Sequence, residues 1–374
     1  MKLAYIVNAR IPTEKAHGYQ ISKMCSEFAK AGADVTLFFP DRRNDIGKDL
    51  FEYYGIEKNF NVVAVRCLDA VRFAPVLRGL AFVIQTKLFL KALKAANIDK
   101  ETVVYTRNPE VASEYYKKGN RVFYDAHNFP EKDPARIVNA LRGVSGIVAN
   151  SSGTARAFKE AGFERVLVAH NGVDISEFDV RLDSREARAR MGLRQDAKIA
   201  MYVGHLYAWK GIDLVVEAAV RLPDVLFAVV GGTKKDILKY ENIKKARNLA
   251  NVYFLGHRAR KDIPVFLRAA DVLLLPNAAV SAESEKYTSP LKMFEYMASS
   301  TPIVASDLPS MREVLDQNTA TFFAPGDAGQ LISAIERVLG NASEGMAKAR
   351  LARIKAEGYT WDNRAKAILN FIKG

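Results

Sequence analysis

The sequence predicts an α/β protein made of two doubly wound halves, and three observations carry that prediction. The chain has 374 residues, which is too long for one ordinary hydrophobic core and suits two domains. Short apolar segments alternate with longer amphipathic ones, as in parallel sheets covered by helices on both faces. The alternation stops at the turn signal Asn171-Gly172-Val173-Asp174 and restarts after a polar stretch that ends near residue 196.

In the first half, a strand over 2–7, a helix over 19–31 ending at Gly32 and a strand over 34–39 form a βαβ unit. A long helix is predicted over 78–96, with a broad apolar face and lysines on or beside the other. A loop and helix are predicted over 107–116. The remaining strands are predicted at 61–65, 102–106, 121–124, 146–149 and 166–168.

The second half repeats this pattern. Its strands are predicted at 199–203, 226–230, 251–254, 271–275 and 303–305, with a helix over 212–222. Helical segments follow residue 339, and the chain closes with an amphipathic helix over 359–373 that carries aromatic residues.

Composition narrows the class of protein. A hydrophobic content of 49% and a charged content of 26% are those of a globular protein, and no apolar run approaches the roughly 18 residues that span a membrane. The first strand is too short for a signal-peptide core. Cys25 and Cys67 lack metal-ligand spacing and indicate thiols in a reducing compartment, so we expect a cytoplasmic protein.

The net charge of +13 indicates an anionic partner. Candidates are nucleic acid, an anionic membrane surface or a phosphorylated substrate; the alternative is a solvated basic surface with no ligand. The helix over 78–96, flanked by Arg72 and Lys100, could lie on anionic lipid. Equally, it could be a packed crossover helix whose lysines are solvated.

The stretch over 286–315 carries the strongest signal for a ligand. Ser289 is a good N-cap and Pro290 suits the first helical position. The amides of Leu291 and Lys292 would then be unpaired donors at the positive end of a helix, with Glu295 one turn on. This arrangement suits a nucleotide diphosphate, with phosphate on the amides and sugar hydroxyls on the carboxylate. The alternative is an ordinary amphipathic helix with a Lys292–Glu295 pair.

Two further segments bring backbone close to a ligand. Residues 204–211 (GHLYAWKG) follow a strand and place Lys210 at a helix start, and residues 229–233 (VVGGT) run into paired glycines. Walker, GxGxxG, HExxH, GxSxG and CxxC patterns are absent from the sequence, which counts against nicotinamide, metallohydrolase and serine-nucleophile chemistry. Each histidine follows a predicted strand, and we interpret at least His127 and His205 as lying in a cleft; the five are His17, His127, His170, His205 and His257.

These motifs, in this order, resemble the retaining glycosyltransferase family 4. The resemblance rests on NGVD, YVGH…WKG, VVGG, NVYFLG…IPVFLRAADVLLLP and SPLKMFEYMASSTPIVASDLPSMREVL, with RIPTEKAHGYQISKM and YDAH in the first half. It implies the GT-B fold, two Rossmann-like domains facing a central cleft. The domains expected are an acceptor-binding domain over 1–172 and a nucleotide-sugar domain over 173–357, with a C-terminal helix over 358–374 packing back on the first domain.

The resemblance also assigns roles to residues. His127 would contact the donor sugar near the reacting carbon, Lys210 would neutralise the leaving diphosphate, and His205 stands where the family has an Arg; these are the candidate catalytic residues. Glu295 matches the second Glu of the E-x7-E motif, the ribose ligand, while Tyr287 replaces the first. The expected donor-binding residues are Gly18, Gly204, Gly232, His257, Arg258, Tyr287, Ser289, Leu291, Lys292 and Glu295.

The implied reaction moves a hexose-type sugar from a nucleotide-diphosphate donor to a glycan, lipid-linked or other cell-envelope acceptor. Front-face attack would retain the anomeric configuration, with no metal and no cofactor. We expect a nucleotide sugar and such an acceptor as partners, with an anionic membrane surface as a further candidate, and no nucleic acid. The alternatives are a GT-B epimerase of sugar nucleotides and a non-catalytic protein that binds an anionic surface.

Overall fold

A computed structural model describes residues 1–77 and 79–374 of the chain; Arg78, the first residue of the helix predicted over 78–96, lies outside the described residues. The chain divides into two compact units. The first consists of Met1–His170 together with Trp361–Gly374, and the second of Asn171–Thr360. The boundaries predicted from the sequence lay at 172/173 and 357/358.

The first unit is built on a parallel sheet of seven strands in the order β3-β2-β1-β4-β5-β6-β7. Its strands are β1 (Lys2–Ile6), β2 (Asp34–Pro40), β3 (Asn61–Val65), β4 (Val103–Thr106), β5 (Val122–Ala126), β6 (Gly146–Ala149) and β7 (Val166–Val168). Its helices are α1 (Ala16–Lys30), α2 (Leu50–Tyr54), η1 (Ala70–Phe73), α3 (Ala74–Leu77), α4 (Leu80–Leu93), η2 (Lys94–Ala96), α5 (Pro109–Lys117), α6 (Pro134–Leu141), α7 (Ser152–Glu160) and α16 (Trp361–Lys373).

The second unit is built on a parallel sheet of six strands in the order β10-β9-β8-β11-β12-β13. Its strands are β8 (Lys198–Val203), β9 (Val225–Val230), β10 (Val252–Gly256), β11 (Val272–Leu275), β12 (Ile303–Ser306) and β13 (Thr321–Phe323). Its helices are η3 (Ile175–Phe178), α8 (Ser184–Met191), η4 (Ala208–Lys210), α9 (Ile212–Arg221), α10 (Lys234–Ala246), η5 (Arg260–Asp262), α11 (Ile263–Ala269), η6 (Glu283–Tyr287), α12 (Leu291–Ala298), α13 (Pro309–Arg312), α14 (Ala328–Gly340) and α15 (Ala342–Ala356).

Both sheets reverse their strand order at one point, between β1 and β4 in the first unit and between β8 and β11 in the second. The central strands are buried on both faces, which explains why their sequences are nearly continuous apolar runs. In open parallel sheets, ligands bind outside the carboxyl ends of the strands at such a reversal. The loops after β1, β4, β8 and β11 flank these reversals, so we expect functional side chains in and beside them.

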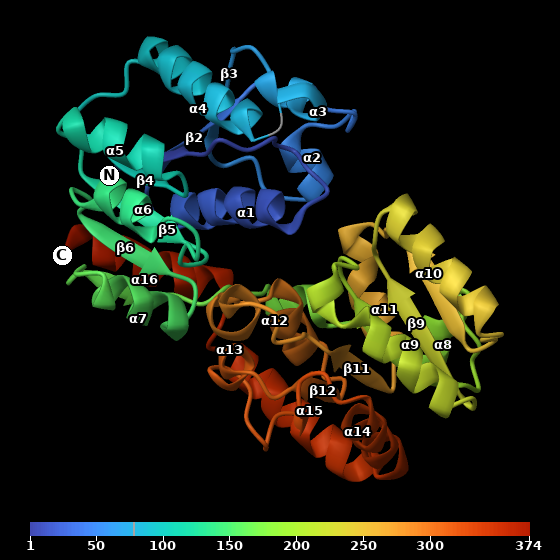
Figure 1. Cartoon of the computed structure of the whole chain (residues 1–374). Helices are drawn as coiled ribbons and strands as arrows, with labels where there is room; N and C mark the ends of the chain where they lie inside the picture. The colour runs from blue at the N-terminus through green and yellow to red at the C-terminus, as the bar shows by residue number, and fades with distance from the viewer. Residues whose placement is uncertain (78) are drawn as a thin grey trace. The chain divides into compact units, whose positions relative to one another are not determined.

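The last helix, α16, belongs to the first unit. The Trp361 ring lies edge-on to Tyr19 of α1, with centroids 6.2 Å apart, and Phe371 packs on Phe123 of β5 at 5.8 Å. Arg121 and Arg165 donate hydrogen bonds to the carbonyls at the end of the helix. Figure 1 shows α16, in red, among the blue and green elements of this unit.

The observed elements differ from the predicted ones mainly at their ends. The first helix begins at Ala16 instead of residue 19, and the helix expected to reach residue 96 is an α-helix only to Leu93, followed by a 3₁₀ turn that stops at the left-handed Asn97. Strand β13, which has three residues, was not predicted.

Candidate functional site

In the second unit, three loops at the carboxyl edge of the sheet touch one another through glycines. Gly231 follows β9 with a φ of +113°, and a Cβ there would lie 2.2 Å from the carbonyl oxygen of Gly204, which follows β8. Gly211 has a φ of +74°, and its Cβ would lie 1.8 Å from the carbonyl oxygen of Pro276, after β11. Only glycine fits such contacts, so the sequence brings these loops together.

Two lysines with displaced pKa values lie at this edge. Burial lowers the pKa of Lys210 to about 7, against the opposing attraction of Glu283, and the Lys210 ammonium lies 3.5 Å from the centroid of the Trp209 ring. Lys292 is only 8% exposed, and its Nζ lies 3.8 Å from the centroid of the Tyr202 ring without a hydrogen-bond partner among the described residues. Burial, followed by repulsion from Lys210, holds the pKa of Lys292 well below its ordinary value. A bound anion would stabilise the charged form of both lysines.

Helix α12 begins one residue later than predicted, and the prediction that Ser289 is its N-cap is wrong. Its N-cap is Pro290, which is extended and offers no side-chain hydrogen bond. The Ser289 hydroxyl instead accepts a hydrogen bond from the Asn171 backbone amide at 3.3 Å, so it is committed elsewhere. The amides of Leu291 and Lys292 at the start of the helix therefore lack a side-chain cap, as a phosphate-binding helix end requires.

The alternative interpretation of α12, an ordinary amphipathic helix with a Lys292–Glu295 pair, does not match the structure, in which Glu295 pairs with Arg260. Residues 292–299 are all buried. Glu295 accepts from Nη1 of Arg260 at 2.7 Å, and Nη2 of Arg260 reaches Glu177 at 3.1 Å. Arg260 thus orients the carboxylate expected to bind ribose, a contact that the sequence did not reveal.

The other residues expected to bind the donor surround this edge. Tyr287 ends η6, whose first residue is Glu283, and Gly232 follows Gly231 after β9. His205 follows Gly204, and its ring stacks on Tyr207 with centroids 5.1 Å apart.

His257 and Arg258 follow β10 at the edge of the same sheet and are exposed. The Arg258 guanidinium lies 5.7 Å from the Phe266 ring centroid. The second unit therefore supplies every expected donor-binding residue except Gly18.

Gly18 belongs to the first unit and has a local packing reason to be glycine. A Cβ at this position would lie 2.0 Å from the Tyr54 hydroxyl and 2.6 Å from the Thr13 methyl group. The Tyr54 hydroxyl donates to the Thr13 carbonyl and accepts from the Thr13 amide, which fixes the loop before α1.

Beside the strand-order reversal of the first unit, a buried carboxylate on β5 is surrounded by four hydrogen-bonding side chains. Asp125, near the end of β5, has a fully buried side chain, and its Oδ2 accepts from the Tyr5 hydroxyl at 2.8 Å and from Arg107 Nε at 2.7 Å. His127 Nε2 lies 3.1 Å from the same oxygen, and Arg364 Nη2 lies 3.2 Å from Oδ1. Burial alone would raise the pKa of Asp125, but Arg107, His127 and Arg364 hold it well below its ordinary value.

Two histidines of the first unit, His127 and His17, are neutral at pH 7. Burial and then Arg107 lower the pKa of His127 to about 4, and the same two causes lower the pKa of His17 to about 4. The His127 side chain remains 26% exposed. A neutral imidazole that is partly exposed can accept a hydrogen bond from an uncharged ligand or donate one to it.

Sequence reasoning missed three functional candidates. Asp125 lies inside the YDAH motif but was not singled out, and Arg260 had no motif at all. Asn277 follows β11 at the reversal; it is fully buried, and neither its amide nitrogen nor its oxygen has a hydrogen-bond partner within the described ranges. Asn277 could have been identified from the sequence only as a polar residue that closely follows a predicted strand.

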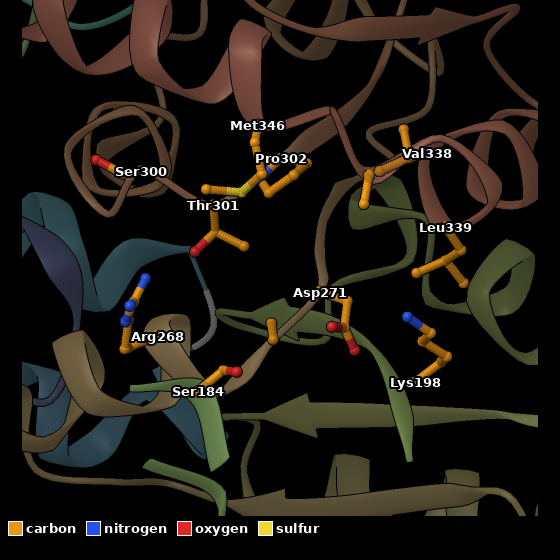
Figure 2. Close-up of a pocket in the computed structure, with 12 residues that line it drawn as sticks. Ser184, Lys198, Arg268, Asp271, Ser300, Thr301, Pro302, Val338, Leu339 and Met346 are labelled. Carbon is orange, nitrogen blue, oxygen red and sulfur yellow. The ribbon is translucent and has the colours of Figure 1, made fainter. Parts of the chain in front are cut away.

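A cavity of about 270 Å³ lies at the opposite, amino edge of the second sheet (Figure 2). Its walls include Lys198 at the start of β8 and Thr301 before β12, while Asp271 is paired with Arg188 at 2.8 Å. None of the expected site residues lines it. In the part of the chain that the structure describes, no group of three or more His, Cys, Asp or Glu side chains could hold a metal ion, and no helix could cross a membrane.

Comparison with known proteins finds a family match within the second unit. Residues 183–359 match the family described as Glycosyl transferases group 1. The D-inositol 3-phosphate glycosyltransferases of Mycobacterium tuberculosis and Mycobacterium bovis are 32% identical to this chain over 213 residues. That match covers 55% of this chain and 43% of the relatives, so it spans less than half of their length.

Solved structures match the whole chain. Anabaena HepE in complex with UDP and glucose superposes with a TM-score of 0.77 at 20% identity, covering 100% of both chains. Sucrose-phosphate synthase from Thermosynechococcus elongatus superposes with a TM-score of 0.77 at 17% identity, covering 100% of this chain and 98% of the other. WaaG, a glycosyltransferase involved in lipopolysaccharide biosynthesis, gives 0.73 at 17%, covering 100% of both. The predicted two-domain α/β fold is confirmed.

Proposed function

We propose that this chain, a GT4-like member of the group 1 glycosyltransferases, transfers a hexose from a nucleotide-diphosphate sugar to a glycan or lipid-linked acceptor of the cell envelope, with retention of configuration. The observation that carries the proposal is a pair of lysines with lowered pKa values, Lys210 and Lys292, beside the start of α12, which has no side-chain cap. The UDP and glucose bound to the related HepE fold support a nucleotide sugar as the donor.

The second unit supplies what the departing diphosphate needs. When the bond between the anomeric carbon and the diphosphate oxygen breaks, negative charge grows on the leaving group. Lys210, Lys292 and the amides at the start of α12 would stabilise that charge at fixed positions, with His205 beside them. These groups supply positive charge without a metal ion, so we propose a metal-independent and cofactor-free reaction.

The transfer step needs no protein nucleophile. The acceptor hydroxyl oxygen forms the new bond to the anomeric carbon on the same face as the leaving group, and its proton passes to the leaving phosphate oxygen. His127 would hold the donor sugar near the reacting carbon, and Glu295, oriented by Arg260, would bind the ribose hydroxyls.

We further propose that the enzyme works at the inner face of an anionic membrane in the cytoplasm. Between residues 70 and 98 the sequence contains no acidic residue, and Lys87 and Lys91 of α4 are exposed. The same segment, together with Leu68 two positions before it, exposes a concentration of apolar side chains: Leu68, Phe73, Val76, Leu80, Phe82, Val83 and Ile84. Apolar side chains beside lysines suit the interface of an anionic bilayer.

A thermal-shift screen in EDTA against UDP, GDP, ADP and their sugar conjugates tests the donor. One nucleotide family should raise the melting temperature, by roughly 2.7 kcal/mol of stability at a hundredfold excess over its dissociation constant. The Lys210→Ala variant should lose that shift, while Lys198→Ala, at the opposite edge of the same sheet, should keep it. The donor so identified should then be consumed only when acceptor is present. Turnover without acceptor would favour an epimerase, and no shift with any nucleotide would favour a non-catalytic protein.

Sedimentation with vesicles tests the membrane partner. The chain should bind phosphatidylglycerol vesicles and release them at high salt, and Leu80→Ser with Val83→Ser should weaken binding. Equal binding to neutral phosphatidylcholine vesicles, or unchanged binding by the double variant, would contradict this part of the proposal.

A further inference from the structure

We infer that Asp125 is a positioning residue that fixes His127 in the tautomer with the proton on Nε2, so that Nδ1 presents a hydrogen-bond acceptor to the ligand. We infer further that α16 completes this arrangement through Arg364. The hydrogen bond between Asp125 Oδ2 and His127 Nε2, at 3.1 Å, is the contact that carries the inference.

The tautomer follows from the chemistry of the two partners. Asp125 is ionised, because two arginines and a tyrosine stabilise its carboxylate, and an ionised carboxylate only accepts hydrogen bonds. The nitrogen that faces it must therefore carry the proton. Since His127 is neutral at pH 7, its other nitrogen is unprotonated.

The charges around His127 keep it in this state. Arg107, Arg364, Asp125 and His17 are the titratable or charged groups that act on it. Burial and the two guanidiniums disfavour the imidazolium, and Asp125 offsets them only in part. The ring thus remains a neutral acceptor across the physiological range.

Arg364 brings the C-terminal helix into the site. It lies in the first turn of α16, its side chain is 2% exposed, and Nη2 reaches Asp125 Oδ1 at 3.2 Å. Nη1 donates to the His170 carbonyl at 2.8 Å, so both ends of the guanidinium are held. Because a carboxylate held on both oxygens cannot rotate freely, Arg364 fixes the oxygen that His127 meets.

The tautomer of His127 determines which chemical group of the ligand it can bind. An acceptor nitrogen binds a hydrogen-bond donor, so the group that His127 recognises is a hydroxyl and not a phosphate or carboxylate oxygen. This step rests on the proposed function, in which that hydroxyl belongs to the transferred sugar. The tautomer itself does not depend on the proposed function.

Nitrogen-15 NMR of the intact chain, labelled at histidine, tests the tautomer without any substrate. The His127 signals, assigned by their loss in His127→Gln, should show a protonated Nε2 and an unprotonated Nδ1 at pH 7, with no titration above about pH 5. In Asp125→Asn the amide can turn either face to the ring, so the two tautomers should mix, while exposed His257 stays unchanged. A protonated Nδ1 in the wild-type chain, or an unaltered spectrum in Asp125→Asn, would overturn the inference.

A second pair of variants guards against loss of the fold. Arg364→Lys keeps one charge near Asp125 and should retain the wild-type tautomer, whereas Arg364→Gln should broaden or mix it. If the donor screen succeeds, Arg364→Gln should lower kcat at least tenfold with a smaller change in KM. If both Arg364 variants keep the wild-type tautomer, Arg364 has no positioning role.

Discussion

The two units carry the same strand-order reversal but balance charge at it in opposite ways. In the first unit, Asp125 meets Arg107 and Arg364, and the carboxylate is saturated by four donors from its own unit. In the second, Lys210 and Lys292 repel each other, and Lys292 Nζ has no hydrogen-bond partner among the described residues.

This difference indicates different roles for the carboxyl edges of the two sheets. A network whose carboxylate is already saturated holds its members rigidly and prepares a neutral histidine before a ligand arrives. A buried ammonium group such as that of Lys292, which has no hydrogen-bond partner among the described residues, destabilises the ligand-free protein and gains a partner only when an anion binds. Under the proposed function, the edge of the first sheet would position a group that binds the sugar, and the edge of the second sheet would hold the charge of the diphosphate.

The largest effect should come from breaking the first network. Asp125→Ala leaves Arg107 and Arg364 buried without their carboxylate and should lower the free energy of unfolding by about 3–5 kcal/mol in urea denaturation. The control is Asp362→Ala, which removes an exposed pair with Lys366 on the same helix as Arg364 and should cost only about 0.5 kcal/mol. A similar loss of unfolding free energy in the two variants would show that the hydrogen-bond network around Asp125 contributes no more to stability than an exposed ion pair.

Removing a lysine from the carboxyl edge of the second sheet should change the free energy of unfolding in the opposite direction. Lys292→Met should raise the stability of the ligand-free protein by about 1–3 kcal/mol, because it removes a buried polar group without a partner. The same variant should bind the nucleotide diphosphate at least tenfold more weakly, which is about 1.4 kcal/mol. Lys198→Met, an exposed lysine at the other edge, should change neither quantity by more than about 0.5 kcal/mol. A destabilised Lys292→Met protein would mean that this lysine is structural.

The second edge should also make stability depend on pH. Lys210 has a pKa of about 7 in the folded chain, below its ordinary value of 10.5. Below pH 7 the lysine is charged in both states and its full penalty applies; between pH 7 and the ordinary value only the unfolded chain holds the proton, so stability rises with pH. The gain from Lys210→Met should therefore be greatest below pH 7 and shrink towards pH 10. A gain that is constant with pH would contradict the lowered pKa.

The smallest effect should come from the carboxylate of the second edge. Glu295→Gln weakens the bond to Arg260 and the proposed contact with ribose, which should cost about 1 kcal/mol of nucleotide affinity. Removing the ribose hydroxyls from the nucleotide should weaken binding to the wild-type chain and have no effect on Glu295→Gln. Glu217→Gln, which alters an exposed pair with Arg247, serves as the matched control. An undiminished loss for the deoxy nucleotide in Glu295→Gln would remove Glu295 from the ribose site.

Sequence reasoning predicted the fold well because local patterns determine it. The strands at 61–65, 146–149 and 166–168 match the structure because each is an apolar run bounded by polar residues. Lys210 and Lys292 could be singled out because they lie at predicted helix starts after strands.

The contacts that tune the site could not be predicted. Glu295 and its partner Arg260 are separated by 35 positions, and Asp125 and Arg364 by 239, so neither pair follows a local pattern. Ser289 looked like a cap because its type and position were right, but Asn171, 118 positions away, engages its hydroxyl. Local sequence does not encode which of two hydrogen bonds a side chain makes.

Isothermal titration of UDP, with GDP and ADP in parallel, into the intact chain in EDTA tests the central claim most directly. We expect that one of these nucleotides binds without metal, that the double variant Lys210→Met with Lys292→Met lowers its affinity at least a hundredfold, and that His127→Gln in the first unit changes the affinity by only a few-fold. Binding that survives loss of both lysines, or that disappears with His127→Gln, would contradict the assignment of the charge-holding edge to the second unit.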